Sequence, residues 1–198
     1  MSRLIESIRL FNGVFENLHW HQMRMDKSRY ELYSLESISL SGLFHQYKVP
    51  QQGLFKARVV YDTAVRLVEF QPYQRKQIKS LRAVNDNLID YRYKWEDRST
   101  LQKHLEAKET CDDILVIKNK LVTDSSYANI VFKKQGEWLT PHQPLLHGTM
   151  RSKLLTMDKI HEAEIYIDDI HTFESYKMIN AMLGFDSEEN DISTIFVE

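Results

Sequence analysis

Three charged residues stand in short polar segments and could do chemistry if the fold buries them. Lys94 lies in YRYKWEDRS. A buried lysine loses the solvation of its ammonium group, so its pKa falls and it supplies the neutral amine that covalent catalysis needs. Arg24, in HQMR, has a guanidinium that suits a dianionic group, and Asp124, in DSSYAN, offers a carboxylate. Taken singly, each has an ordinary explanation as a solvated lysine, a helix-surface arginine or a turn-forming aspartate.

The sequence has none of the short motifs of the common catalytic sites. It contains no GxGxxG, GxxxxGK[ST], HExxH, GxSxG or CxxC. His19 and His21 would point to one side of a strand and could approach a metal ion, but no carboxylate or cysteine stands at matching spacing. We therefore predict no metal, and the chemistry must come from residues that the fold gathers.

Composition and charge bound the class of protein. The 198 residues allow one domain or two small ones, and 42% hydrophobic with 27% charged residues excludes disorder. A formal charge of −2 gives no reason to expect a nucleic-acid partner. The single cysteine cannot form an internal disulfide, and charges interrupt MSRLIESIRLF before a signal-peptide core could form. No apolar run approaches the roughly 18 residues of a membrane span, so we expect a cytoplasmic protein.

The elements that must position these residues form a mixed pattern. Asn12-Gly13 predicts a turn within a hairpin over residues 4–15, and Asp62-Thr63 a second turn within residues 57–72. Strand-like and helix-like runs then alternate irregularly, so we expect an α+β fold and not a doubly wound parallel sheet. Helices are predicted over residues 19–35, 100–109 and 150–160, three strands of an antiparallel meander over 112–119, 120–132 and 137–141, and a strand or strand–helix junction over 164–170.

Five segments, in this order and spacing, carry a family resemblance: ESIRLFNG, HQMR, YRYKWEDRS, LVTDSSYANIVF and LLHGTMR. Together they resemble the fold-type IV, or class IV aminotransferase, family of pyridoxal phosphate (PLP) enzymes. That family includes branched-chain and D-amino-acid aminotransferases and 4-amino-4-deoxychorismate lyase. The resemblance spans nearly the whole chain, and it implies PLP as cofactor and two α/β domains of the D-amino-acid aminotransferase-like fold.

The resemblance assigns roles to the first group of residues. Lys94 takes the place of the lysine that forms a Schiff base with PLP and then moves a proton. In the lyase branch an Asn-Arg pair follows that lysine at the third and fourth positions, where this chain has Asp97 and Arg98. Arg24 matches the arginine of the family's H-x-x-R, which binds the cofactor phosphate.

A second group of residues lies later in the chain. Asp124 takes the place of an acidic residue, usually glutamate, that contacts the pyridine nitrogen and stands five positions before an asparagine, here Asn129. A carboxylate there keeps the ring nitrogen protonated. The remaining implied contacts are Gly148, Thr149 and Met150, which resemble the family's phosphate-binding G-I-T-R segment at a helix start, and Asn180 and Ala181, which pass beside the phosphate and the substrate carboxylate.

Two reactions and one non-catalytic role stay open at this point. We favour a lyase that converts 4-amino-4-deoxychorismate into 4-aminobenzoate and pyruvate, because Asp97-Arg98 and GTMR are closer to that branch. The alternatives are an aminotransferase acting on a branched-chain or D-amino acid, and a compact family member without catalysis. We expect a smaller N-terminal domain over residues 1–88, a PLP-binding domain over 89–198, a small-molecule amino substrate, and, by resemblance, a homodimer.

Overall fold

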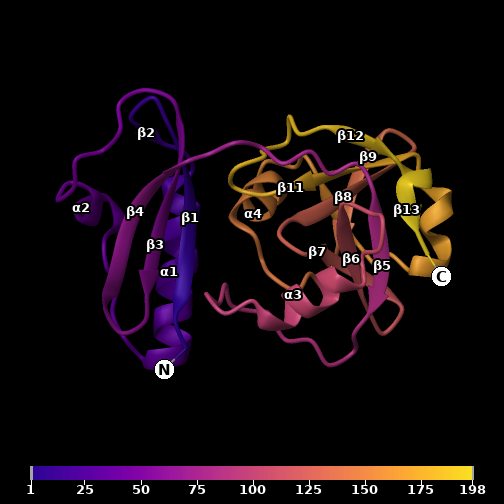
Figure 1. Cartoon of the computed structure of the whole chain (residues 1–198), viewed down its shortest axis with the longest axis horizontal. Helices are drawn as coiled ribbons and strands as arrows, with labels where there is room; N and C mark the ends of the chain where they lie inside the picture. Colours follow the sequence, from indigo (N-terminus) through magenta and orange to yellow (C-terminus); the bar gives the residue numbers. More distant parts are fainter. Residues whose placement is uncertain (1, 198) are drawn as a thin grey trace. The chain divides into compact units, whose positions relative to one another are not determined.

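The computed structural model describes residues 2–197, which form two compact units (Figure 1). The first unit comprises the chain as far as Arg75 together with Tyr93–Asp97, and the second comprises Lys76–Arg92 and the chain from Arg98 onward. The boundary predicted between residues 88 and 89 falls inside Lys76–Arg92. The segment that carries Lys94 therefore belongs to the first unit, although the chain has already entered the second unit before it.

An antiparallel sheet of four strands, in the order β2-β1-β3-β4, frames the first unit. In β1 the side chains of Leu4, Glu6, Ile8 and Leu10 are buried, while the residues between them are only partly so. This alternation is that of a strand with one face against a core. The strands are β1 (Leu4–Phe11), β2 (Val14–Phe15), β3 (Leu54–Tyr61) and β4 (Val65–Pro72).

Both predicted hairpins are confirmed. Asn12 and Gly13 have φ values of 47° and 82° between β1 and β2. Two successive positive φ angles are what a two-residue type I′ turn requires, which is why Asn-Gly favours it. In the second hairpin, Asp62 holds the turn by accepting a hydrogen bond from the backbone N–H of Ala64 at 3.1 Å.

Helix α1 (Leu18–Tyr33) packs on this sheet (Figure 1). The short helix α2 (Leu40–Phe44) contacts α1. The structure confirms the helix predicted over residues 19–35. Its buried residues include His21, Met25 and Ser28, whose spacing of three and four places them on one helical face. Met25 joins the core of the first unit, which includes Leu4 and Ile8 from β1.

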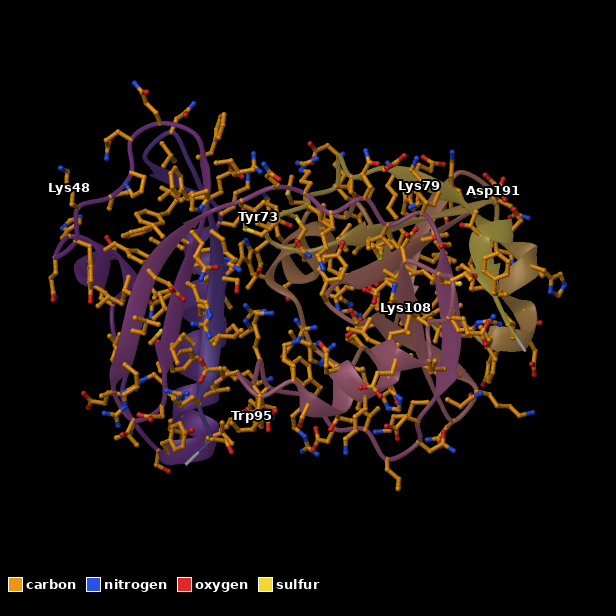
Figure 2. All side chains as sticks on the ribbon, in the orientation of Figure 1. Lys48, Tyr73, Lys79, Trp95, Lys108 and Asp191 are labelled. Carbon is orange, nitrogen blue, oxygen red and sulfur yellow. The ribbon has the colours of Figure 1, made fainter. Side chains whose placement is uncertain are left out.

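The segment around Lys94 adds a short antiparallel contact to the start of β1. The backbone N–H of Ile5 donates to the carbonyl of Lys94 at 2.9 Å, and that of Glu96 donates to the carbonyl of Arg3 at 2.8 Å. Between these two bonds, Trp95 pairs with Leu4 and packs against the core of the first unit (Figure 2). The position of Lys94 is therefore fixed by the strand that carries Glu6.

A mixed sheet of nine strands frames the second unit (Figure 1). Seven strands follow the order β10-β9-β8-β7-β6-β5-β13, with β11 beside β8 and β12 beside β11. The pairs from β6 through β9 are antiparallel, and those of β5 with β6, β13 with β5 and β10 with β9 are parallel. The strands are β5 (Leu81–Asn85), β6 (Asp113–Lys118), β7 (Leu121–Ser125), β8 (Asn129–Lys134), β9 (Glu137–Pro141), β10 (His161–Ala163), β11 (Ser175–Ile179), β12 (Glu189–Asp191) and β13 (Ile195–Phe196).

The predicted meander is present, but it has four strands where three were predicted. The run over residues 120–132, predicted as one strand, divides into β7 and β8. The reason is a turn held by Ser125, whose hydroxyl accepts hydrogen bonds from the backbone N–H groups of Tyr127 and Ala128. Serine side chains compete in this way with continued strand pairing. The turn places Asp124 directly opposite Asn129 on the neighbouring strand.

The helices of the second unit complete the α+β fold, which confirms the predicted class. Helices α3 (Ser99–Glu106) and α4 (Thr149–Thr156) confirm two predictions. Residues 164–170 lead from β10 into a 3-10 helix, η1 (Ile167–Thr172), and a second 3-10 helix, η2 (Ile192–Thr194), precedes β13. Within residues 2–197, no helix combines the length and the apolar character that crossing a membrane demands.

Two methionines of α1 provide a test of the packing in the core of the first unit. Met25 is fully buried and Met23, two positions earlier, is 50% exposed. Met25→Ala removes buried methylene groups and leaves a cavity, so we expect a loss of about 2–5 kcal/mol in the free energy of unfolding, measured by urea titration. Met23→Ala is the matched control and should change it by less than about 0.5 kcal/mol. Equal losses in the two variants would contradict the packing described for α1.

Candidate active site

A buried carboxylate organises the polar residues of the first unit. Glu6 points from β1 into the interior, where neither its side chain nor that of His21 is exposed. Arg24 donates from Nε to Glu6 Oε1 at 2.9 Å and from Nη2 to Oε2 at 2.6 Å. His21 Nδ1 lies 2.6 Å from the same Oε2. Since His21 and Arg24 are three residues apart on α1, one helical face presents both groups to one strand residue.

The charges of this cluster fix its protonation. Burial opposes ionisation of Glu6, but the charge of Arg24 and the hydrogen bonds from His21 and Arg24 outweigh it and lower the pKa of Glu6 to about 2. Burial lowers the pKa of His21, and the charges of Arg24 and Lys94 lower it further, against the raising effect of Glu6. His21 is therefore neutral at pH 7 and donates its Nδ1 proton to the ionised Glu6.

Of the two predicted residues of the first unit, Arg24 belongs to this cluster and Lys94 stands near it. Lys94 is partly buried, and its charge adds to the effect of burial, the largest cause, in lowering the pKa of His21. Glu96, two residues later, accepts hydrogen bonds or ion pairs from Arg58 Nη2 and Arg3 Nε, each at 2.6 Å. These contacts secure the segment just after Lys94 to the first unit.

Glu6 is the residue of this site that the sequence analysis did not assign. It appeared only as the first letter of ESIRLFNG. A signal was present, because a glutamate occupies an inward position of a strand whose other inward residues, Leu4, Ile8 and Leu10, are apolar. A buried charge must be paired, and the arginine of HQMR is its partner.

The structure corrects the interpretation of the two early histidines. His19 and His21 were predicted to share one side of a strand, but both lie on α1. On a helix, residues two apart point in different directions, so His21 is buried against Glu6 while His19 is exposed. Among residues 2–197 no cluster of three metal-ligating side chains is found.

In the second unit, Asp124 is a buried carboxylate at the end of β7. Asn129 Nδ2 donates to its Oδ1 at 2.7 Å, and the backbone N–H of Leu146 donates to its Oδ2 at 2.9 Å. Burial raises the pKa of Asp124 to about 6, although these two hydrogen bonds and the charge of Arg151 act in the opposite direction. Asp124 has no ion-pair partner within the described part of the chain. It is therefore a buried acid that a cationic N–H donor would stabilise in its ionised form.

Gly148, Thr149 and Met150 form the start of α4, as the sequence predicted for a helix beginning there. All three are buried, and Gly148 is the N-cap residue, with no side chain that caps the helix. A helix start has backbone N–H groups without intrahelical acceptors and a partial positive charge, which suit an anion. Arg151, also in this turn, is engaged elsewhere, donating to the carbonyl of Pro141 and to Glu162.

Asn180 and Ala181 follow β11. The Asn180 Oδ1 accepts hydrogen bonds from the backbone N–H groups of Met182 at 2.8 Å and Leu183 at 3.0 Å, and its Nδ2 contacts the carbonyl of Tyr127 at 3.4 Å. The asparagine therefore shapes the turn after β11 and ties it to the β7–β8 turn. Its contact with a substrate stays a prediction.

The predicted site residues thus fall into two groups, each assembled within its own unit. The first holds Arg24 and Lys94 beside Glu6 and His21. The second holds Asp124 and Asn129 with the residues that lead into Gly148, Thr149 and Met150.

Comparison with known proteins gives the family. Residues 51–185 match the family model described as amino-transferase class IV. A protein of uncharacterised function from Haemophilus influenzae is 36% identical over 187 residues, which cover 93% of this chain and 100% of that protein. A crystal structure from Haemophilus somnus 129PT, titled as a candidate 4-amino-4-deoxychorismate lyase, is 34% identical with a TM-score of 0.87, over 93% of this chain and 98% of that one.

More distant structures share the fold. A candidate amino-acid aminotransferase from Mesorhizobium loti is 18% identical with a TM-score of 0.77 over 100% of both chains. The PLP-bound form of a hypothetical aminotransferase from Mycobacterium tuberculosis is 14% identical with a TM-score of 0.79, over 98% of this chain and 81% of that one.

The chain belongs to the class IV aminotransferase family. It is accordingly a PLP-dependent enzyme, and the resemblance, the fold and the cofactor inferred from five sequence segments are confirmed.

The described residues fit PLP on two observations. Asp124 is a buried acid without a cationic partner, which is the environment that a protonated pyridine nitrogen would complete. The N-cap residue of α4 is Gly148, which has no side chain to cap the helix, and a helix start of this kind suits a phosphate. Asp124 and the backbone of Gly148, Thr149 and Met150 would therefore hold the ring nitrogen and the phosphate.

The pKa of Glu6 gives a pH-dependent test of the first group. Its value falls from 4.5 to about 2 in the folded protein. This shift contributes about 3 kcal/mol of stability that is present above pH 4.5 and is lost as the pH falls toward 2. Glu6→Gln should remove this contribution, so the variant is about 3 kcal/mol less stable than the native protein at pH 7, and the gap narrows below pH 4.5.

Urea unfolding at several pH values measures this gap, with Glu36→Gln as the control because Glu36 is exposed. A gap of the same size at pH 3 and pH 7 would show that folding does not lower the pKa of Glu6.

Proposed function

We propose that the protein is a 4-amino-4-deoxychorismate lyase that forms 4-aminobenzoate and pyruvate. The observation that carries the proposal is the likeness to the Haemophilus somnus structure, which is 34% identical over 93% of this chain. The residues after Lys94 support it, because Arg98 stands at the position of the arginine in the lyase branch. Arg98 Nη2 donates to the carbonyl of Ser126, so it secures the start of α3 to the turn that follows Asp124.

Each polar residue then has a definite task. Lys94 Nζ would hold the cofactor aldehyde, and the same amine would take the proton from the substrate ring. Glu6 holds the guanidinium of Arg24 at two nitrogens, which fixes the orientation of the group that would bind the cofactor phosphate. Asp124 would keep a proton on the ring nitrogen. PLP, when bound, supplies the electron-accepting ring that stabilises the substrate carbon after proton loss.

The atoms of the lyase reaction balance without a second substrate. The substrate ring loses its proton, and the carbon–oxygen bond to the enolpyruvyl group breaks with its electron pair leaving on oxygen. The released enolpyruvate takes up one proton at its methylene carbon and becomes pyruvate, so the proton lost by the ring is balanced. The ring becomes aromatic, which drives the reaction forward.

A class IV aminotransferase acting on a branched-chain or D-amino acid is the second candidate. It stays open because the pair after Lys94 matches the lyase branch at Arg98 only, since Asp97 stands where that branch has asparagine. A non-catalytic role is disfavoured, because a chain freed from chemistry has no physical reason to keep an amine, a held guanidinium and a buried acid in its sequence. The proposal includes a homodimer in the cytoplasm, a small-molecule amino substrate and a place in folate biosynthesis, since 4-aminobenzoate is a folate precursor.

Lys94 is tested by absorbance. The protein purified with PLP should show the visible band of a lysine-linked cofactor, and Lys94→Ala should lose it, because no other amine would take its place. Lys27→Ala is the matched control, since the Lys27 side chain is 66% exposed on α1. A band that persists in Lys94→Ala would remove this lysine from the central role.

The reaction is tested by its products. With 4-amino-4-deoxychorismate and no added keto acid, the lyase should release pyruvate and 4-aminobenzoate in equal amounts over many turnovers. An aminotransferase without an acceptor would stop after one turnover and accumulate pyridoxamine phosphate. Coupled detection of pyruvate and absorbance of the cofactor distinguish the two, and the second result would replace the lyase by the aminotransferase.

A further inference from the structure

A closed set of hydrogen bonds joins β7, β8 and the residues that precede α4. Besides its bond to Asp124 Oδ1, Asn129 Nδ2 donates to the carbonyl of Leu146 at 2.8 Å. The N–H of the same Leu146 returns to Asp124 Oδ2 at 2.9 Å. One amide nitrogen thus uses both of its protons, and the two oxygens of one carboxylate are each held by a different donor.

The side-chain oxygen of Asn129 explains why residue 148 is glycine. A Cβ atom added to Gly148 would lie 2.0 Å from Asn129 Oδ1 and 3.1 Å from its Cγ. The φ angle of Gly148 is −70°, which any residue adopts, so the glycine is required by this close approach and not by its backbone conformation. Asn129, itself buried, therefore determines the course of the backbone into α4.

We propose that Asn129 is a positioning residue that acts through Asp124 and through the backbone of residues 146–148. Asp124, Asn129, Leu146 and Gly148 form what we call the amide clamp. Its catalytic meaning rests on the proposed function, which assigns Asp124 to the ring nitrogen and the start of α4 to the phosphate. The clamp sets the separation between these two contacts, because the Asn129 side chain bonds Asp124 and the carbonyl of Leu146 and lies against Gly148, the N-cap residue of α4.

Aspartate is the informative substitution at position 129. It has the size of asparagine but lacks the N–H donor, and it places a second carboxylate against Asp124. Two carboxylates in one buried site do not both ionise readily, so the apparent pKa of Asp124 should rise by about one unit or more. Carbon-13 NMR of the aspartate carboxyl groups in the cofactor-free protein measures this shift.

Asn119→Asp is the matched control for the titration. Asn119 is exposed, so this variant adds the same charge away from the clamp and should leave the titration of Asp124 unchanged. An unchanged Asp124 titration in Asn129→Asp would overturn the proposal, and so would an equal shift in Asn119→Asp.

Stability provides an independent test that needs no cofactor. Gly148→Ala should lower the midpoint of urea unfolding in the native background, because its methyl group meets Asn129 Oδ1. In an Asn129→Ala background that obstacle is gone, so the same glycine substitution should lower the midpoint much less. Strictly additive effects would show that the two residues do not act together.

PLP binding separates this inference from the function on which it rests. If the native protein binds PLP, Asn129→Ala should weaken binding at least about tenfold, a loss of about 1.4 kcal/mol. Unweakened binding in the variant would overturn the positioning role. If the native protein binds no PLP, the proposed function fails, while the carboxyl titration and the unfolding cycle still decide whether the clamp exists.

Discussion

The ion pair between Glu6 and Arg24 is the interaction on which the first unit depends. A carboxylate without solvent is costly, and Glu6 is fully buried. Two guanidinium nitrogens and the imidazole of His21 compensate for that cost, and the pKa of Glu6 falls to about 2 as a result. Because Glu6 and the backbone partner of Lys94 are neighbours on β1, the strand that buries the acid also sets the position of the lysine.

The second unit treats its buried acid in the opposite way. Among residues 2–197, Asp124 receives hydrogen bonds but no ion pair, and burial raises its pKa to about 6. The difference between the two acids is the presence of a hydrogen-bonded cation, since both are buried and both accept two or more hydrogen bonds. The negative charge of Glu6 is thus already paired with Arg24, whereas a cation would be needed to stabilise the ionised form of Asp124. The family's cofactor has one in its protonated pyridine nitrogen.

Local sequence signals predicted most of the elements. Asn12-Gly13 specifies positive φ at two adjacent positions, and the structure has that turn. Helical spacing in the segment with Arg24 and in the segment after Gly148 predicted α1 and α4. The division of residues 120–132 into two strands was missed, because it depends on the Ser125 hydroxyl turning back on its own backbone, a contact that competes with strand pairing.

The sequence by itself determined the family and the chemical types of the site: an amine, a guanidinium and an acid in a fixed order along the chain. The family and these chemical types follow from residue identity and spacing, so they can be inferred without knowledge of the contacts. Only the tertiary structure decided that Glu6 holds Arg24, that Asn129 joins Asp124 to Leu146, and that Gly148 lies against Asn129. Such contacts join positions far apart in the chain, and no local pattern sets their distances, because strand register and the burial of each group decide them together.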